Sequence, residues 1–171
     1  LAVNGTAAIV EFPGVLYRGG AEAKIRKYLI DNNYVDAVIQ LPSDLFFGTT
    51  IATCIIVLKK SKTDNAVLFI DASTEFTRTG NKNKLTPDNQ QNILMSIADR
   101  EDEAHFARRV PNSEIAANDY NIAVSSYVEA EDTRVATDIV ALNAEIARIV
   151  ARQAELRTSI DEIVADLEAS A

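Results

Sequence analysis

Lysines at the end of one apolar stretch are candidates for contacts to phosphate groups. Lys59, Lys60 and Lys62 follow the apolar run 51–58. Cationic side chains at the end of a strand suit contacts to nucleic-acid phosphates. An ordinary solvated strand end has the same composition, so the pattern leaves both interpretations open.

Signatures of catalysis are otherwise missing from the sequence. It contains no Gly-x-Gly phosphate loop, no His-Glu-x-x-His motif and no serine-centred nucleophile elbow. The single cysteine, Cys54, lies inside an apolar run and is predicted to be a core residue. The single histidine, His105, is predicted to lie at a solvated helix end. One Cys and one His, far apart in the sequence, are too few ligands for a zinc site, so no bound metal is expected.

Charge and hydropathy restrict the class of protein. The net charge of −8 argues against a freestanding DNA-binding module, but residues 1–62 carry +2 and the remainder −10. Any nucleic-acid contact is therefore expected in the first third. No apolar run reaches the roughly 20 residues of a membrane span, and no secretory signal is present, which predicts a cytoplasmic protein without membrane contact. The first residue, Leu1, suggests a chain cut from a longer one.

The first 72 residues have an α/β pattern. Apolar runs predict strands at 6–12, 35–41, 51–59 and 67–71, and helical spacing predicts a helix over 21–31. The connection 42–50 is too short for a crossover helix, so the strands around it should pair antiparallel. We therefore predict a mixed sheet. The strand at 6–12 should lie at an edge that a later segment or a second copy covers.

Residues 73–128 are more polar, and we predict loops and short helices there. Thr86-Pro87-Asp88 is a helix start, with Thr as N-cap and Pro in the first turn. That helix should run to about Glu103. A shorter helix should follow Ser113, and residues 74–84 are predicted to be a loop.

Residues 129–171 are predicted to form one long helix. Apolar side chains recur at alternating spacings of four and three residues, with one polar member. A helix of this length cannot bury such a stripe alone, so it needs a partner helix. The members of this seam are Val135, Ile139, Leu142, Ile146, Ile149, Gln153, Leu156, Ile160, Ile163 and Leu167.

Several stretches, in this order and spacing, resemble the methyltransferase (M) subunit of type I restriction-modification systems. The stretches cover most of residues 5–128, and the helical tail is also similar to that family's carboxy-terminal helix. They are Gly5–Val10, Pro13–Glu22, Lys24–Lys27, Ala37–Pro42, Leu45–Thr49, Cys54–Leu58, Val67–Ser73, Asn118–Ile122 and Ser126–Val128.

The resemblance implies the carboxy-terminal part of a class I S-adenosylmethionine-dependent methyltransferase fold that methylates adenine in DNA. The glycine-rich cofactor loop and the Asn-Pro-Pro-aromatic motif of such enzymes are absent from these 171 residues. We therefore expect S-adenosylmethionine in the intact subunit but none in this chain. No catalytic or cofactor-binding residue is assigned, and the chain alone is predicted to be inactive.

The resemblance also implies a target-base pocket and partners. Adenine methyltransferases flip the target base and hold it against aromatic side chains, and Phe46 or Phe47 stands at the matching place, although either could instead plug the core. The implied partners are the specificity and restriction subunits and double-stranded DNA. Self-association of the chain is a further expectation. The alternative is an interaction module that only assembles the complex through its helical end.

Overall fold

A mixed five-stranded sheet organises the first part of the chain. The computed structural model describes residues 1–131 and 138–169, and it divides into two units, residues 1–131 and residues 132–171. The strands of the first unit are β1 (Thr6–Glu11), β2 (Val35–Gln40), β3 (Cys54–Lys59), β4 (Ala66–Asp71), β5 (Thr77–Thr79), β6 (Lys82–Lys84) and β7 (Ala107–Pro111). Its helices are α1 (Ala21–Asp31), α2 (Pro87–Asp99), α3 (Asn112–Ala117) and the short 3-10 helices η1 (Pro13–Leu16) and η2 (Val124–Ser126).

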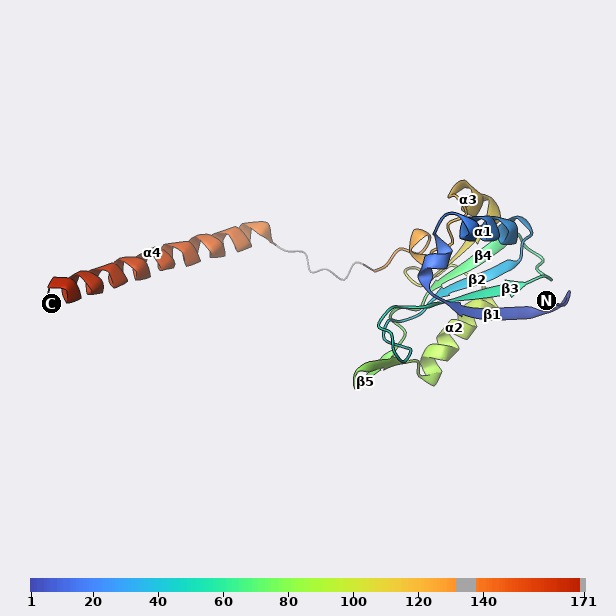
Figure 1. The fold of residues 1–171 in the computed structure, drawn as a ribbon, viewed down its shortest axis with the longest axis horizontal. Helices are drawn as coiled ribbons and strands as arrows, with labels where there is room; N and C mark the ends of the chain where they lie inside the picture. Colours follow the sequence, from blue (N-terminus) through green and yellow to red (C-terminus); the bar gives the residue numbers. More distant parts are fainter. Residues whose placement is uncertain (132–137, 170–171) are drawn as a thin grey trace. The chain divides into compact units, whose positions relative to one another are not determined.

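The order of the strands is β1-β3-β2-β4-β7. Strand β3 runs antiparallel to both β1 and β2, whereas β2 and β4 are parallel. The predicted antiparallel pairing across residues 42–50 is therefore confirmed. Strands β1, β2 and β4 point the same way, so their carboxyl ends meet at one edge of the sheet (Figure 1).

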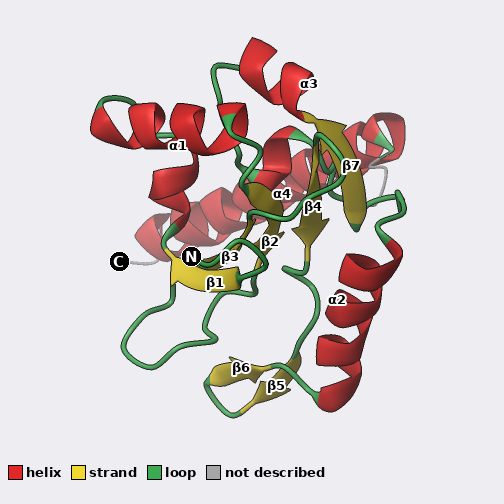
Figure 2. Cartoon of the chain, turned by 90° about the vertical axis from the view of Figure 1, so that its right-hand side faces the viewer, coloured by secondary structure: helices red, strands yellow, loops and turns green. Residues whose placement is uncertain are grey.

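Helices cover both faces of the sheet. Successive apolar residues of β2 and β4 point to opposite faces, and they are buried on both. Val38 and Phe69 pack with α1, α3 and the segment after it, and Ile39 and Ile70 pack with α2. Figures 1 and 2 show α1 and α3 on one side of the strands and α2 on the other. Strands buried on both faces read as continuous apolar runs, which is why the sequence predicted them.

The predicted start of α2 is confirmed. The Thr86 hydroxyl accepts a hydrogen bond from the Asn89 N–H at 3.3 Å, and the Asn89 side chain accepts one from the Thr86 N–H at 3.0 Å. The predicted end near Glu103 is wrong. Arg100 adopts φ 54°, a left-handed conformation that ends the helix at Asp99.

Three strands were not predicted from the sequence. Strands β5 and β6 form a hairpin inside the segment predicted to be a loop, and β7 adds to the main sheet beside β4. No later segment of residues 1–131 pairs with the outer edge of β1, so the chain does not cover this edge itself, and cover by a second copy stays a prediction.

The second unit contains one long helix, α4 (Ile139–Ala169). Its 31 residues make a helix about 46 Å long, at a rise of about 1.5 Å per residue. Every side chain of α4 is exposed, including all members of the predicted seam from Ile139 to Leu167. Val135, the first predicted member, lies outside the described residues. No helix of the described segments is long and apolar enough to span a membrane.

Candidate functional site

The loop after β2 lies at the carboxyl edge of the parallel strands. The Leu41 N–H donates to the Thr53 carbonyl at 2.9 Å and closes the base of the loop. Beside it, Gln40 pairs with Asp71 at the end of β4. Open α/β sheets bind their ligands outside the carboxyl ends of parallel strands, so a site is expected at this edge.

The two predicted aromatic residues stand on this loop with different exposures. Phe47 is 100% exposed and Phe46 is 40% exposed. The core position next to them is filled by Leu45, which packs against the cluster around Ile39 and Ile70. A fully exposed ring cannot be a core plug, so that alternative is wrong for Phe47.

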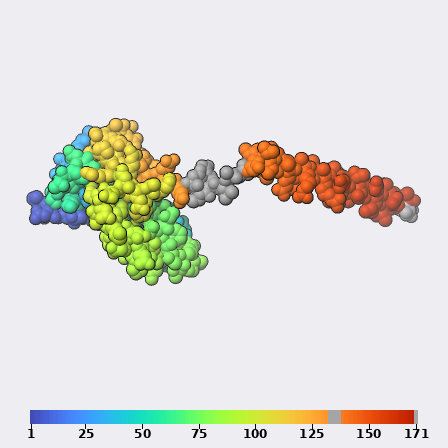
Figure 3. Space-filling view, turned by 180° about the vertical axis from the view of Figure 1, so that it is seen from behind, coloured from blue at the N-terminus to red at the C-terminus, as the bar shows by residue number. Residues whose placement is uncertain are grey.

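The hairpin β5–β6 supports this loop through hydrogen bonds from its side chains and backbone. The Lys82 ammonium donates to the carbonyls of Phe46 and Thr49, each at 3.1 Å. Asn83, which is buried, donates through its side chain to the Ser43 carbonyl at 2.8 Å and through its N–H to the Asp44 carbonyl at 3.1 Å. Figure 3 shows the hairpin, in green, beside the yellow-green α2 on the surface of residues 1–131. The hairpin was not predicted, although Gly80-Asn81 between short polar runs is a hairpin signal.

The three predicted phosphate-binding lysines lie at the opposite edge of the sheet. Lys59 ends β3 and the other two follow it, and β3 is antiparallel to β2, so the structure does not bring the lysines together with Phe46 and Phe47. Lys59 pairs with Thr6 at the amino end of β1. The Lys60 ammonium lies 5.8 Å from the centre of the Tyr34 ring.

Lys62 has a structural role that argues against a phosphate contact. Its ammonium donates to the carbonyls of Val35 and Ala66, each at 2.6 Å. Burial lowers the pKa of Lys62 to about 8, although the carboxylates of Asp64 and Asp36 oppose that shift. Its donors are therefore used inside the protein, where they join the amino ends of β2 and β4.

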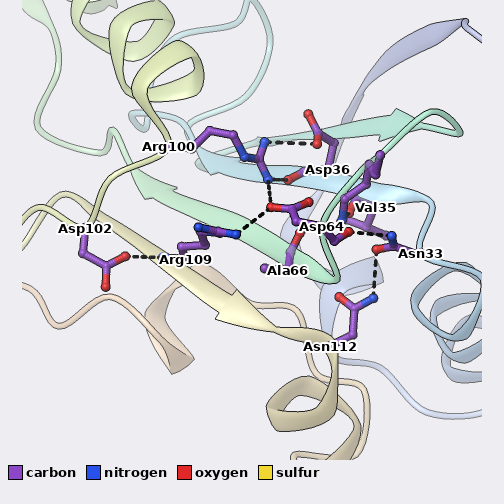
Figure 4. A network of polar contacts seen from close by, with 10 residues as sticks. Asn33, Val35, Asp36, Asp64, Ala66, Arg100, Asp102, Arg109 and Asn112 are labelled. Carbon is purple, nitrogen blue, oxygen red and sulfur yellow. Dashed lines mark hydrogen bonds and ion pairs between the residues drawn. The ribbon is translucent and has the colours of Figure 1, made fainter.

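An ion-pair network occupies the same edge (Figure 4). The Asp64 carboxylate lies 3.1 Å from the Arg109 guanidinium and 3.6 Å from that of Arg100, which also pairs with Asp36 at 3.0 Å. Asp102 accepts a hydrogen bond from the Arg109 N–H at 2.6 Å. These contacts tie the end of α2 and strand β7 to β2 and the turn before β4. This edge therefore holds the fold together.

The segment 118–127, which includes the Asn118–Ile122 stretch that resembles the family, contacts η1 and α1. The buried Arg26 guanidinium donates to the carbonyls of Tyr120 and Val15, each at 2.9 Å. The Tyr127 hydroxyl donates to the Asn121 carbonyl at 2.7 Å, and its ring stacks on Phe69 with centres 4.4 Å apart. The sequence predicts only loops and short helices over 73–128, because the residues that this segment contacts lie far earlier in the chain.

The lone cysteine and histidine do not form a site. Cys54 is fully buried, as predicted, and burial raises the pKa of its thiol to about 11, which disfavours the reactive thiolate. His105 lies in the turn before β7 rather than at a helix end, and its ring nitrogen Nδ1 lies 2.9 Å from the Glu129 carbonyl oxygen. Within residues 1–131 and 138–169, no three metal-ligating side chains cluster.

The carboxyl edge does not fit S-adenosylmethionine by itself. The segments that follow β1, β2 and β4 begin Phe12-Pro13, Leu41-Pro42 and Ala72-Ser73, and none is a glycine-rich loop. In dinucleotide-binding α/β folds, glycines at this place let the backbone approach the cofactor closely, and these segments lack them. No step is therefore assigned to the cofactor on these residues. This edge instead carries the exposed ring of Phe47, on a loop that Lys82 supports.

Comparison with known proteins confirms the resemblance to M subunits. The chain is 47% identical over 169 residues to a type I restriction enzyme methylase subunit from Mycoplasma pneumoniae, covering 98% of this chain and 31% of that protein. A type I methylase subunit from Methanocaldococcus jannaschii is 33% identical, with 94% of this chain and 28% of that protein covered. The crystal structure of a type I methyltransferase subunit from Streptococcus thermophilus superposes with a TM-score of 0.71 at 45% identity, over 73% of this chain and 27% of that one.

The chain thus spans 27% to 31% of the length of these relatives. The family described as N-6 DNA Methylase matches residues 1–136, which is most of the sequence. The chain belongs to the N-6 DNA methylase family.

Proposed function

We propose that residues 1–131 form the target-base side of an adenine-specific DNA methyltransferase subunit of a type I restriction-modification system. The observation that carries this proposal is Phe47, a fully exposed ring on a loop that Lys82 supports, at the carboxyl edge of the parallel strands. Enzymes that modify a base take it out of the DNA stack and hold it against aromatic or apolar side chains. Phe47 can offer a face to such a base, and the partly buried Phe46 can support it.

The sheet topology supports a class I S-adenosylmethionine-dependent methyltransferase fold. In our proposal β1, β2 and the antiparallel β3 between them are the later strands of that fold, and the complete subunit binds S-adenosylmethionine. The cofactor supplies the methyl group when it is bound. Residues 1–131 contribute the surface that receives the base.

Helix α4 is the proposed docking element for the specificity subunit. Eight aliphatic seam side chains on α4 are exposed, which is costly in water because burial of apolar surface contributes about 25 cal/mol per Å². A pair of long helices in the specificity subunit would cover this stripe, with Gln153 setting the register. The restriction subunit and double-stranded DNA complete the proposed assembly.

Photo-cross-linking tests where the base is held. The target adenine of the recognition sequence is replaced by 5-iodouracil, and the complete subunit, assembled with its specificity subunit, is irradiated on this DNA. We expect the cross-link to map to the loop 42–53, at Phe47 or Phe46, because the extruded base stacks there. A cross-link that maps to Lys59 or Lys60 would place the DNA at the opposite edge and contradict the proposal.

A further inference from the structure

The loop that carries Phe47 has few internal constraints. Its tip is closed by one long backbone hydrogen bond, from the Asp44 N–H to the Thr50 carbonyl at 3.4 Å, and by the Ile51 N–H to the Thr49 hydroxyl at 3.0 Å. Gly48, directly after Phe47, has φ 80°, a conformation that side chains disfavour. Left to itself, such a loop would sample many conformations, because ordering backbone costs entropy.

We infer that the β5–β6 hairpin holds this loop in the conformation that presents Phe47, with Lys82 as the positioning residue. This inference rests on the proposed function. The Lys82 ammonium donates to the carbonyls of Phe46 and Thr49, on either side of the Phe47-Gly48 pair. Hydrogen bonds from a charged donor are stronger than neutral ones. One side chain thereby fixes both ends of the segment that carries the ring.

The hairpin is itself anchored to the start of the loop. Asn83 is 5% exposed and binds the carbonyl of Ser43 through its side chain. The Arg78 guanidinium bridges the Asp44 carboxylate and the Asn83 side-chain oxygen, each at 3.1 Å. Asp44 also lies 4.0 Å from the Lys82 ammonium. The hairpin therefore has a fixed base from which Lys82 reaches the tip of the loop.

Lys84 provides a matched control on the same hairpin. Its backbone pairs with Thr77 in the hairpin, but its side chain is exposed and, among the contacts of the described residues, makes no hydrogen bond or ion pair. Lys82→Met removes the ammonium and keeps the aliphatic stem, Lys82→Arg keeps a cationic donor, and Lys84→Met removes the same charge without touching the loop.

The test uses the complete subunit assembled with its specificity subunit. Single-turnover methyl transfer and DNA affinity are measured, together with the fluorescence of 2-aminopurine at the target position, which rises when the base is unstacked. A displaced positioning group slows a reaction by up to about a hundredfold. For Lys82→Met we expect methyl transfer about ten- to a hundredfold slower and a smaller fluorescence rise, with DNA affinity unchanged. Lys82→Arg should recover most of the rate, and Lys84→Met should match the parent.

Three results would overturn the inference. Lys82→Met could methylate as fast as the parent while Phe47→Ala is slow, in which case the proposed function stands and the hairpin has no positioning role. Lys82→Met could weaken DNA binding as much as it slows transfer, which would make Lys82 a phosphate contact. Phe47→Ala could be as fast as the parent, which would remove the proposed function and this inference together.

Discussion

Replacing Leu142, Ile146 and Ile149 together by Asp is expected to abolish co-purification with the specificity subunit. These side chains lie on one stripe of α4 and are 46%, 50% and 55% exposed in the single chain. In a helical interface they would be buried, and three carboxylates there would have to lose their water without a partner charge. Removal of an unpaired charge from water costs several kcal/mol, which is enough to prevent assembly.

The control for this experiment is a variant with the same added charge on the opposite face of α4. Ala144, Ala147 and Ala151 lie there, about half a turn from the stripe, and are also exposed. Their replacement by Asp should leave co-purification intact. Undiminished complex formation by the Leu142, Ile146 and Ile149 variant would show that the stripe is not the docking surface.

Phe69→Ala is expected to lower the free energy of unfolding by about 3–5 kcal/mol, as for other large-to-small substitutions in a core. Phe69 is fully buried at the centre of β4, and its ring stacks on Tyr127 at 4.4 Å between centres. The substitution leaves a cavity under the Tyr127 ring. The hydroxyl of that ring donates a hydrogen bond to the Asn121 carbonyl. The segment 118–127 should therefore loosen with the core.

Urea unfolding of the chain, followed by circular dichroism, measures this effect. Phe12→Ala is the control, because Phe12 is mostly exposed and a surface substitution of this kind changes stability by about 0.5 kcal/mol or less. An equal loss in both variants would mean that Phe69 does not occupy a core position in β4.

The central strands could be predicted from the sequence because they are buried on both faces. Residues 66–70 are a continuous apolar run, residues 35–40 are apolar except for Asp36 and Gln40, and the short connection after the latter fixes an antiparallel return strand. The cap at Thr86 is equally local, since its partner Asn89 is three residues away. Features of this kind depend only on residues close together in the chain, so they can be predicted from a single sequence.

The missed elements depend on distant residues. Strand β7 contains Arg108 and Arg109 between its buried positions, so it lacks the alternation of a half-buried strand and is recognisable only beside β4. The role of Lys62 depends on the carbonyls of Val35 and Ala66, which tertiary structure brings to it. A lysine that ends a strand looks the same in sequence whether it faces phosphate or a backbone carbonyl.

The candidate site was predicted in part for the same reason. The resemblance placed Phe46 and Phe47 in a base pocket but could not distinguish them, because both follow Leu45 in one loop. Exposure in the structure favours Phe47, and the hairpin that supports it comes from a segment some thirty residues later. Only the folded chain brings Lys82 to that loop.

Methyl transfer by the complete subunit carrying Phe47→Ala is the most direct test of the central claim. Stacking of a base on an aromatic ring contributes about 1–3 kcal/mol, so the rate should fall by about ten- to a hundredfold while the affinity for S-adenosylmethionine is unchanged. Phe47→Tyr keeps the ring and should retain most of the rate. If Phe47→Ala and Phe46→Ala both methylate at the rate of the parent, neither residue holds the target base, and residues 1–131 do not form the target-base side of the enzyme through this loop.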